Sequence, residues 1–508
     1  MSAPPIDPIA LQVLSGGLRS ICDEMGAVLV RASYSPNIKE RHDCSTALFD
    51  AGGELVMQAE HIPVHLGSMP AAVEAVAALA DPDRVAADDL WILNDPFRGG
   101  THLPDITLVS PLVISGELRG WAASRAHHAD VGGPTPGSMP ADSRSLAEEG
   151  VVIEPQRVDD DGFAAIASRM RRPDQRLADL RAQRAANRRG QARIAELSER
   201  LAAGMTAVLD YAERRSRDAI AALADGTYEA ADALEAAGGG EIPLCVRVLI
   251  DGEEIRVDFS GSAPQVAGNL NCPLPVTRAA TLFAIRALTD PDAPASAGAF
   301  RPVTIDAPAG SVLNANPPAA VAAGNVETSS RVADLLFAAL AEVADGPAQG
   351  QGTMNNLTLA GSDRHGEFTY YETIGGGQGA CPEAPGPSAV HVAMSNTLNT
   401  PVEALESELP VRITELALRR GSGGTGRMAG GDGVVRELEA LAPLRFTLIT
   451  ERRARAPRGR AGGSDGDRGR NSRNGEPLAA KCQGRLEPGD VLRIETPGGG
   501  GLGPPPAA

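Results

Sequence analysis

Two predicted strands and the loop between them occupy residues 90–110, whose sequence is LWILNDPFRGGTHLPDITLVS. The apolar runs 90–93 and 106–110 are short and bounded by Asn, Asp, Pro and Gly, which is typical of buried strands. His102 and Asp105 lie on the Gly- and Pro-rich segment between them. Because strand ends and loops can hold ligands rigidly against a sheet, both side chains could reach one ion.

Histidine is concentrated around this loop, since six of the eight histidines lie within residues 42–128 and carboxylates lie among them. Imidazole and carboxylate suit divalent Zn, Mn or Fe. Asp43, His102, Asp105 and His127 together supply a complete ligand set, although spacing alone does not decide which side chains bind directly. The remaining candidates for proton transfer, ligand orientation or substrate binding are His128, Asp130, His61, His65, Glu60 and Asp95.

The rest of the chain predicts a mixed, multi-domain α+β fold. We expect an N-terminal metal-site domain of strands and helices over residues 1–172, a helical segment over 173–240 and a β-rich domain over 241–508. The predicted helices are 6–33, 70–79, two or three within 174–236 with one around 194–209, 277–288 and 329–343. The predicted strands, besides the two above, are 45–49, 54–58, 120–124, 244–250, 255–259 and 368–374, with an irregular segment at 129–170.

Composition narrows the class of protein. The 508 residues are 43% hydrophobic and 22% charged, as in ordinary globular proteins, and the net charge of −18 argues against a nucleic-acid groove. The six cysteines are far apart and form no CxxC pair, which favours reduced thiols. We recognise neither a signal peptide nor an apolar run of about 18 residues, and we expect a cytoplasmic protein without a membrane partner.

Other motifs give weaker signals. The glycine runs 375–379 and 498–501 could cradle phosphate, but neither matches GxxxxGK[ST] or follows a strand–GxGxxG–helix pattern, so we expect Gly-rich turns and no ATP site in this chain. Cys44 and Cys381 could be nucleophiles, but structural thiols are the simpler interpretation. No GxSxG elbow is present for a serine triad.

Several ordered strings resemble the hydantoinase B/oxoprolinase family along nearly the whole chain, from about residue 7 to residue 503. They include ALFD at 47–50, QAEHIPVHLGSM at 58–69, NDP at 94–96, GGTHLPD at 99–105, DFSGS at 258–262, AGNVET at 323–328, NTLNTP at 396–401, GGDG at 430–433 and TPGGGG at 496–501.

This resemblance implies a B-type subunit that works with a separate A-type, ATP-binding subunit. It implies Asp43, His102, Asp105 and His127 as metal ligands, with ATP used only through the partner. In the implied reaction the partner phosphorylates the carbonyl oxygen of a cyclic amide, such as a hydantoin, oxoproline or lactam. Hydroxide generated at the metal then attacks the activated carbon.

Two alternatives remain open at this point. An enol phosphate of a ketone at the same metal site would instead make the complex an acetone- or acetophenone-type carboxylase. A structural subunit that only completes an A-type enzyme is the other alternative, and the full set of candidate ligands argues against it.

Overall fold

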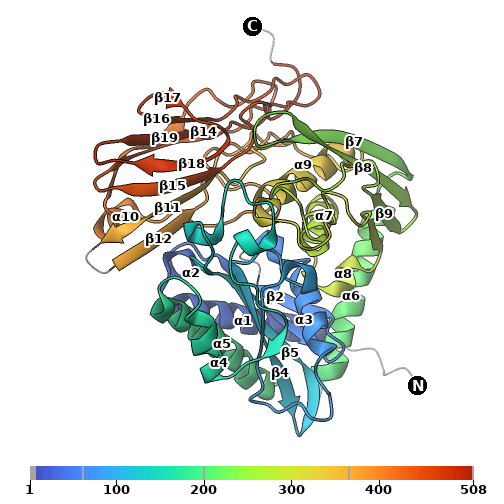
Figure 1. The fold of residues 1–508 in the computed structure, drawn as a ribbon. Coiled ribbons are helices and arrows are strands. Elements are labelled where there is room, and N and C mark those ends of the chain that lie inside the picture. Colours follow the sequence, from blue (N-terminus) through green and yellow to red (C-terminus); the bar gives the residue numbers. More distant parts are fainter. Residues whose placement is uncertain (1–6, 60–61, 198–200, 364–365, 506–508) are drawn as a thin grey trace.

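The computed structural model describes residues 7–59, 62–197, 201–363 and 366–505. Helices and strands are mixed along the chain and form several separate sheets, so the predicted α+β class is confirmed. Figure 1 shows the N-terminal elements at the bottom of the view, the middle of the chain at the upper right and the C-terminal strands at the upper left. The domain division at residues 172 and 240 stays a prediction.

A six-stranded antiparallel sheet with strand order β2-β1-β5-β4-β3-β6 forms the N-terminal part. Helices α1 and α5 pack on one face of the sheet and α3 packs on the other. Successive strand residues point to opposite faces, so neighbouring residues of one strand contribute to different cores. Leu48 contributes to the first core, whereas Ala47 and Phe49 contribute to the second. The elements are α1 Pro8–Ala32, α2 Pro36–Lys39, β1 Cys44–Asp50, β2 Leu55–Ala59, α3 Met69–Ala77, β3 Trp91–Leu93, β4 Asp105–Ile114, β5 Glu117–His127, β6 Gln156–Arg157, α4 Asp160–Ala167 and α5 Pro173–Ala195.

The middle of the chain forms a four-stranded sheet, β10-β9-β8-β7, in which only the β10–β9 pair is parallel. Helices α7 and α9 pack against this sheet and share the largest apolar core with it. A π-helical turn over Gly324–Thr328 leads into α9. The elements are α6 Leu201–Ala221, β7 Gly226–Glu235, β8 Glu241–Asp251, β9 Glu254–Asp258, α7 Leu274–Thr289, α8 Ala297–Phe300, β10 Val303–Asp306 and α9 Ser329–Ala339.

The C-terminal part contains two sheets with orders β12-β11-β15-β18 and β13-β14-β19-β16-β17. Apolar side chains of both sheets meet in one core, which includes Leu357 and Phe446 of the first sheet and Leu438 and Ile494 of the second. The elements are β11 Asn356–Asp363, β12 Gly366–Glu372, α10 Val402–Glu408, β13 Val411–Arg419, β14 Gly433–Ala440, β15 Leu444–Ile449, β16 Arg470–Arg473, β17 Glu476–Pro477, β18 Lys481–Leu486 and β19 Val491–Glu495.

Most predicted elements are present, with two corrections in the helical segment. The helix predicted around 194–209 is present with different bounds, because α5 ends at Ala195 and the next helix, α6, covers Leu201–Ala221. Residues 226–235 form strand β7 rather than helix, because they pair along their whole length with β8. The alanines in this stretch favour a helix locally, and this tertiary pairing overrides that preference. No helix in the described chain is long and apolar enough to span a membrane.

The glycine runs are also different from the prediction, since they are buried segments rather than turns. None of the glycines within 375–379 or 498–501 has a positive φ. The amide N–H groups of Gly498, Gly499, Gly500 and Gly501 all donate to backbone carbonyls of distant segments, so none is left to bind a phosphate. The chains approach so closely that a Cβ on Gly499 would lie 2.0 Å from the carbonyl oxygen of Gln378. Only glycine fits such a backbone-to-backbone contact.

We expect Gly499→Ala to lower the free energy of unfolding by about 3 kcal/mol, because the added methyl group must displace the backbone. Gly17→Ala is the control, since a Cβ at that helical position meets no atom within 4 Å. It should raise the free energy of unfolding by about 0.5–1 kcal/mol. Urea unfolding measures both changes, and equal effects of the two substitutions would contradict the close packing.

The irregular segment between β5 and β6 is held by a buried carboxylate. Glu149 is fully buried and accepts hydrogen bonds from the backbone N–H groups of Val321 and Ala322 and from the Ser143 hydroxyl. Burial raises the pKa of Glu149 to about 7, although these hydrogen bonds act in the opposite direction. The folded chain therefore keeps a proton on Glu149 that the unfolded chain loses near its ordinary pKa of 4.5.

Stability should consequently fall as the pH rises from about 4.5 to about 7, because the folded state binds more protons than the unfolded state in that window. The slope contributed by Glu149 is at most about 1.4 kcal/mol per pH unit. Glu149→Gln removes this titration, so the difference in unfolding free energy between pH 5 and pH 7.5 should shrink. Urea unfolding at both pH values tests this, with the exposed Glu117→Gln as the control. An unchanged difference would contradict it.

Candidate metal centre

The antiparallel pairing of β4 with β5 positions the central residues. Asp105 is the first residue of β4 and His127 is the last residue of β5, and the register pairs them directly. Asp43 immediately precedes β1 on the other side of β5, and its carbonyl accepts a hydrogen bond of 3.0 Å from the His127 N–H. His102 lies three residues before Asp105, and its carbonyl accepts from the Asp105 N–H at 3.1 Å. Strand pairing therefore brings residues from three chain segments to one point.

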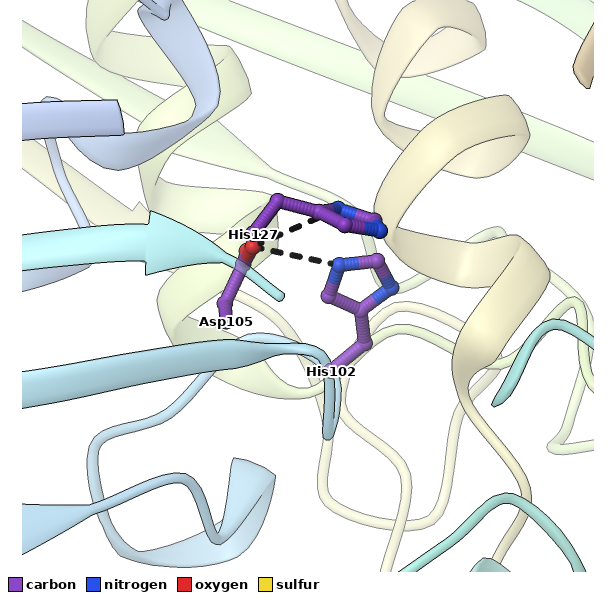
Figure 2. Close-up of side chains that lie close together, drawn as sticks. All are labelled: His102, Asp105 and His127. Atoms are coloured by element: carbon purple, nitrogen blue, oxygen red, sulfur yellow. Dashed lines mark ion pairs between the residues drawn. The ribbon is translucent and has the colours of Figure 1, made fainter. Parts of the chain in front are cut away.

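The side chains of His102, Asp105 and His127 converge. Asp105 Oδ1 lies 3.3 Å from His102 Nε2 and 3.6 Å from His127 Nδ1, and Figure 2 shows the carboxylate beside both imidazole rings. One potential ligand atom from each residue lies within 4.8 Å of the others. Asp43 Oδ2 lies 3.7 Å from His127 Nδ1, next to this group. All four predicted ligands are thus in one neighbourhood, with three in the tightest cluster.

Unpartnered polar atoms indicate that this cluster suits a cation. Within the described ranges, both ring nitrogens of His102, Oδ1 of Asp105 and Nε2 of His127 are buried without a hydrogen-bond partner. Leaving such atoms unsatisfied is costly, and native proteins rarely gather several at one point without a ligand. Imidazole nitrogen and carboxylate oxygen are ordinary donors for a divalent metal. The residues present therefore fit such an ion.

Surrounding groups fix the orientation of the cluster. Asp105 Oδ2 accepts a hydrogen bond of 2.6 Å from the Thr101 hydroxyl and lies 3.4 Å from His65 Nε2. The His127 ring stacks on Tyr371, with ring centroids 4.6 Å apart and 9° between the planes. The Tyr371 hydroxyl donates to Asn356 at 2.6 Å, which fixes the tyrosine ring in turn. Contacts of this kind determine which atom each side chain would present to a bound metal ion.

The electrostatic environment shifts the pKa values of the two carboxyl groups, Asp43 and Asp105, in opposite directions. Burial, followed by the nearby charge of Asp105, raises the pKa of Asp43 to about 7. Burial acts on Asp105 in the same direction, but interactions with His102 and His65 outweigh it and hold the pKa of Asp105 well below its usual range. Burial also lowers the pKa of His127 and of His65, which favours neutral imidazoles able to bind metal.

A small cavity of about 20 Å³ adjoins the cluster, which is room for roughly one water-sized group. Its lining includes Asp43, Asp105, His127 and His65, but also residues from the second half of the chain. We did not predict these lining residues of the second half from the sequence, although the family string at 396–401 includes one of them, Thr397. The missed lining residues are Asn325, Val326, Met354, Tyr371, Thr373, Met394, Ser395 and Thr397.

Three other predicted site residues lie outside the cluster. His128 is the next residue after His127 along the direction of β5, so its side chain points to the opposite face of the sheet. There, His128 Nε2 forms a hydrogen bond of 2.9 Å with Gln183 Oε1. Asp130 accepts from the Gly132 and Gly137 N–H groups and pairs with Arg171, which fixes the loop after β5.

Asp95 has a structural contact of its own, because it caps the short helix at Pro96–Arg98 by accepting from the Phe97 N–H at 2.9 Å. Of the remaining candidates, His65 contacts the cluster, while Glu60 and His61 lie outside the described residues.

The fold is therefore that of an α+β protein in which an antiparallel sheet ends at a buried His–Asp–His cluster. The chain belongs to the hydantoinase B/oxoprolinase family, which it matches over residues 7–505.

Relatives and solved structures extend this match. The chain is 38% identical to 5-oxoprolinase 1 of Arabidopsis thaliana over 98% of its own length, but it spans only 42% of that relative. The B subunit of a putative D-/L-hydantoinase from a Pseudomonas species is 31% identical, over 85% of this chain and 78% of the relative.

Among solved structures, the ATP-dependent caprolactamase of Pseudomonas jessenii has a TM-score of 0.91 at 27% identity, covering 98% of this chain and 92% of that chain. An acetone carboxylase structure shares the fold, with a TM-score of 0.83 at 17% identity over 98% of this chain and 76% of that chain.

We expect the purified chain to bind about one divalent ion, and His102→Ala to lose it, because the substitution removes a ligand from a closely spaced set. Asp95→Asn is the control, since asparagine caps a helix as well as aspartate and lies outside the cluster. Elemental analysis after dialysis against Mn²⁺ or Zn²⁺ measures the content. Retention of the ion by His102→Ala would contradict the site.

Proposed function

We propose that the chain is the metal-dependent B-type subunit of an ATP-dependent cyclic amidohydrolase. The observation that carries the proposal is the group of unpartnered donor atoms on His102, Asp105 and His127 beside a cavity. The names of the relatives support it, since they include a 5-oxoprolinase and an ATP-dependent caprolactamase. Hydantoins, 5-oxoproline and lactams are the corresponding substrate class.

The proposed assembly includes a separate A-type subunit that binds and uses ATP. Three observations support this part of the proposal. The chain spans only 42% of the plant 5-oxoprolinase, and a bacterial relative is named as the B subunit of a hydantoinase. In the glycine runs, the amide N–H groups of residues 376–378 and 498–501 donate to backbone carbonyls, so these groups are not free to cradle a phosphate. We place the complex in the cytoplasm, as the six free thiols favour.

The proposed reaction begins with transfer of the γ-phosphoryl group of ATP to the carbonyl oxygen of the cyclic amide, at the partner. Water then adds to the activated carbon, and cleavage of the C–N bond releases the amine and leaves an acyl phosphate. A second water releases the carboxylate and inorganic phosphate. Phosphorylation is needed because an unstrained amide carbon is a poor electrophile, and the phosphate ester supplies both polarisation and a leaving group.

The residues of this chain have distinct parts in the proposal. His102, Asp105 and His127, with Asp43 beside them, hold the divalent ion, whose identity among Mn, Zn and Fe the donor set leaves open. When bound, such an ion polarises water and substrate oxygen at neutral pH. His65 and Tyr371 are positioning residues, because they contact Asp105 and His127.

We expect the chain co-purified with its A-type partner to open 5-oxoproline, a hydantoin or a lactam ring in an ATP-dependent reaction. His102→Ala should reduce this turnover by at least about a hundredfold, while Asp95→Asn should leave it within about twofold, because only His102 belongs to the ligand set. Product formation by chromatography and coupled ADP release measure the reaction.

Two outcomes would replace this proposal. Consumption of acetone or acetophenone that requires bicarbonate as well as ATP would identify a ketone carboxylase that uses the same metal site. Ring opening that is unchanged in His102→Ala and in metal-free protein would identify this chain as a structural subunit of an enzyme whose chemistry lies in the partner.

A further inference from the structure

The wall of the cavity opposite the metal-ligand cluster is built from hydroxyl groups backed by a buried positive charge. Thr373, Ser395 and Thr397 line the cavity with exposed fractions of 2%, 5% and 6%. Arg41 lies behind them with no exposed surface. Its Nη2 donates to the Thr373 hydroxyl at 2.6 Å and to the Thr397 hydroxyl at 2.9 Å.

Arg41 is unusual because its buried charge is not paired. Among the described residues, the guanidinium donates to backbone carbonyls and to these two hydroxyls, and its Nε has no hydrogen-bond partner. Its central carbon lies 6.0 Å from the centroid of the Tyr371 ring. No ion pair joins Arg41 to any carboxylate in the described part of the chain. A buried charge with no carboxylate in direct contact is costly, and a negatively charged ligand in the cavity would offset that cost.

The hydroxyl groups form a linear series of hydrogen bonds with His391, which begins at Thr373 and ends at Ser395. Thr373 and Thr397 share a bond of 2.6 Å, Thr397 and His391 Nε2 share one of 3.3 Å, and His391 Nδ1 and Ser395 share one of 2.9 Å. Burial and the charge of Arg41 lower the pKa of His391 to about 3, so the imidazole is neutral and carries one N–H.

The hydroxyl and imidazole groups carry one more hydrogen-bond donor than the bonds among them use. The three hydroxyl groups and the single imidazole N–H supply four donors for the three internal bonds. In every arrangement that keeps all three bonds, one O–H group is therefore left over. A leftover O–H on Thr397 would require Thr397 to accept from Arg41, Thr373 and His391 at once, which exceeds the two lone pairs of a hydroxyl. The leftover O–H therefore lies on Thr373 or on Ser395, and both residues line the cavity. The wall always presents a hydrogen-bond donor.

The charge of the site as a whole favours the same kind of ligand. Two buried carboxyl groups, Asp43 and Asp105, and two buried guanidinium groups, Arg41 and Arg125, lie at or near the cluster, so their formal charges sum to about zero. A divalent cation bound to the cluster would leave an excess of about two positive charges. A group with negatively charged oxygen atoms is complementary to such a site.

We propose that Arg41, Thr373, Ser395 and Thr397 form a subsite that binds an anionic oxygen group of the substrate across the cavity from the metal-ligand cluster. The inference rests on the proposed function for the identity of the substrate, which would bring either a phosphoryl group or a carboxylate. The cavity has room for about one oxygen-sized group, so the subsite in this conformation holds one oxygen atom of such a ligand.

Isothermal titration of the Mn²⁺-loaded chain with inorganic phosphate, and separately with acetate, tests the subsite. We expect saturable binding of at least one of the two anions. Tighter binding of phosphate identifies the phosphoryl group as the source, and equal or tighter binding of acetate identifies the carboxylate.

Substitutions at the two ends of the hydroxyl chain give the sharper readout. Thr373→Val and Ser395→Ala should each weaken anion binding only slightly, because the other end still presents a donor. The double variant, made in a Thr397→Val background so that no spare O–H group can move to Thr397, should weaken it by about ten- to hundredfold, the loss expected for a hydrogen bond to a charged group. Arg41→Lys should also weaken it.

The control is Thr447→Val, since Thr447 is a buried strand threonine outside the cavity lining, and it should bind the anion as the wild type does. Metal content must be equal in all variants. Absence of binding of both anions to the wild type, or equal binding by the wild type and the double variant, would overturn the subsite. If the double variant loses binding while the wild-type complex opens no cyclic amide, the subsite stands and the proposed function fails.

Discussion

The pairing register of β4 and β5 is the constraint on which the site depends. It places Asp105 opposite His127, and the neighbouring β1 brings Asp43 to the same end of the sheet. Because side chains alternate between the faces of a strand, a slip of one residue would turn His127 away and bring His128 into its place. The two faces are buried under different helices, α1 and α5 on one side and α3 on the other, so the register is strongly specified.

A cluster of buried polar atoms without partners lowers stability, and the rest of the molecule must tolerate it. The cluster lies where the N-terminal sheet meets residues from the middle and C-terminal parts, including Asn325, Tyr371 and Thr397. The stacking of Tyr371 on His127 and the bonds from Arg41 to Thr373 and Thr397 tie these parts together. The close glycine packing near the C-terminus contributes rigidity by backbone contact rather than by side chains.

The local parts of this arrangement could be predicted from the sequence. Apolar periodicity and turn residues are enough for α1, for the β1–β2 hairpin and for the strands that flank His102. The distribution of histidine indicates the metal-ligand candidates. The alternation of side chains along β5 separates His127 from His128, but the sequence predicts that this strand ends at residue 124, before both.

The long-range parts could not be predicted. Strand β7 forms because β8 pairs with it, and the helix-favouring alanines of 226–235 conceal this. Thr373, Ser395 and Thr397 are ordinary hydroxyl residues whose neighbours in the sequence do not indicate a cavity. Only the fold brings them to face Asp105 across about 250 residues or more of sequence. The prediction of turns for the glycine runs is wrong because their role depends on chain segments that lie far away in the sequence.

The central claim is that His102, Asp105 and His127 hold one divalent ion. Anomalous X-ray diffraction from crystals of the Mn²⁺- or Zn²⁺-loaded chain, recorded at the absorption edge of the metal, tests it most directly. The account predicts one strong anomalous peak about 2.0–2.2 Å from an imidazole nitrogen of each histidine and from a carboxylate oxygen of Asp105. A peak at another place in the fold, or none between these three side chains at full metal loading, would contradict it.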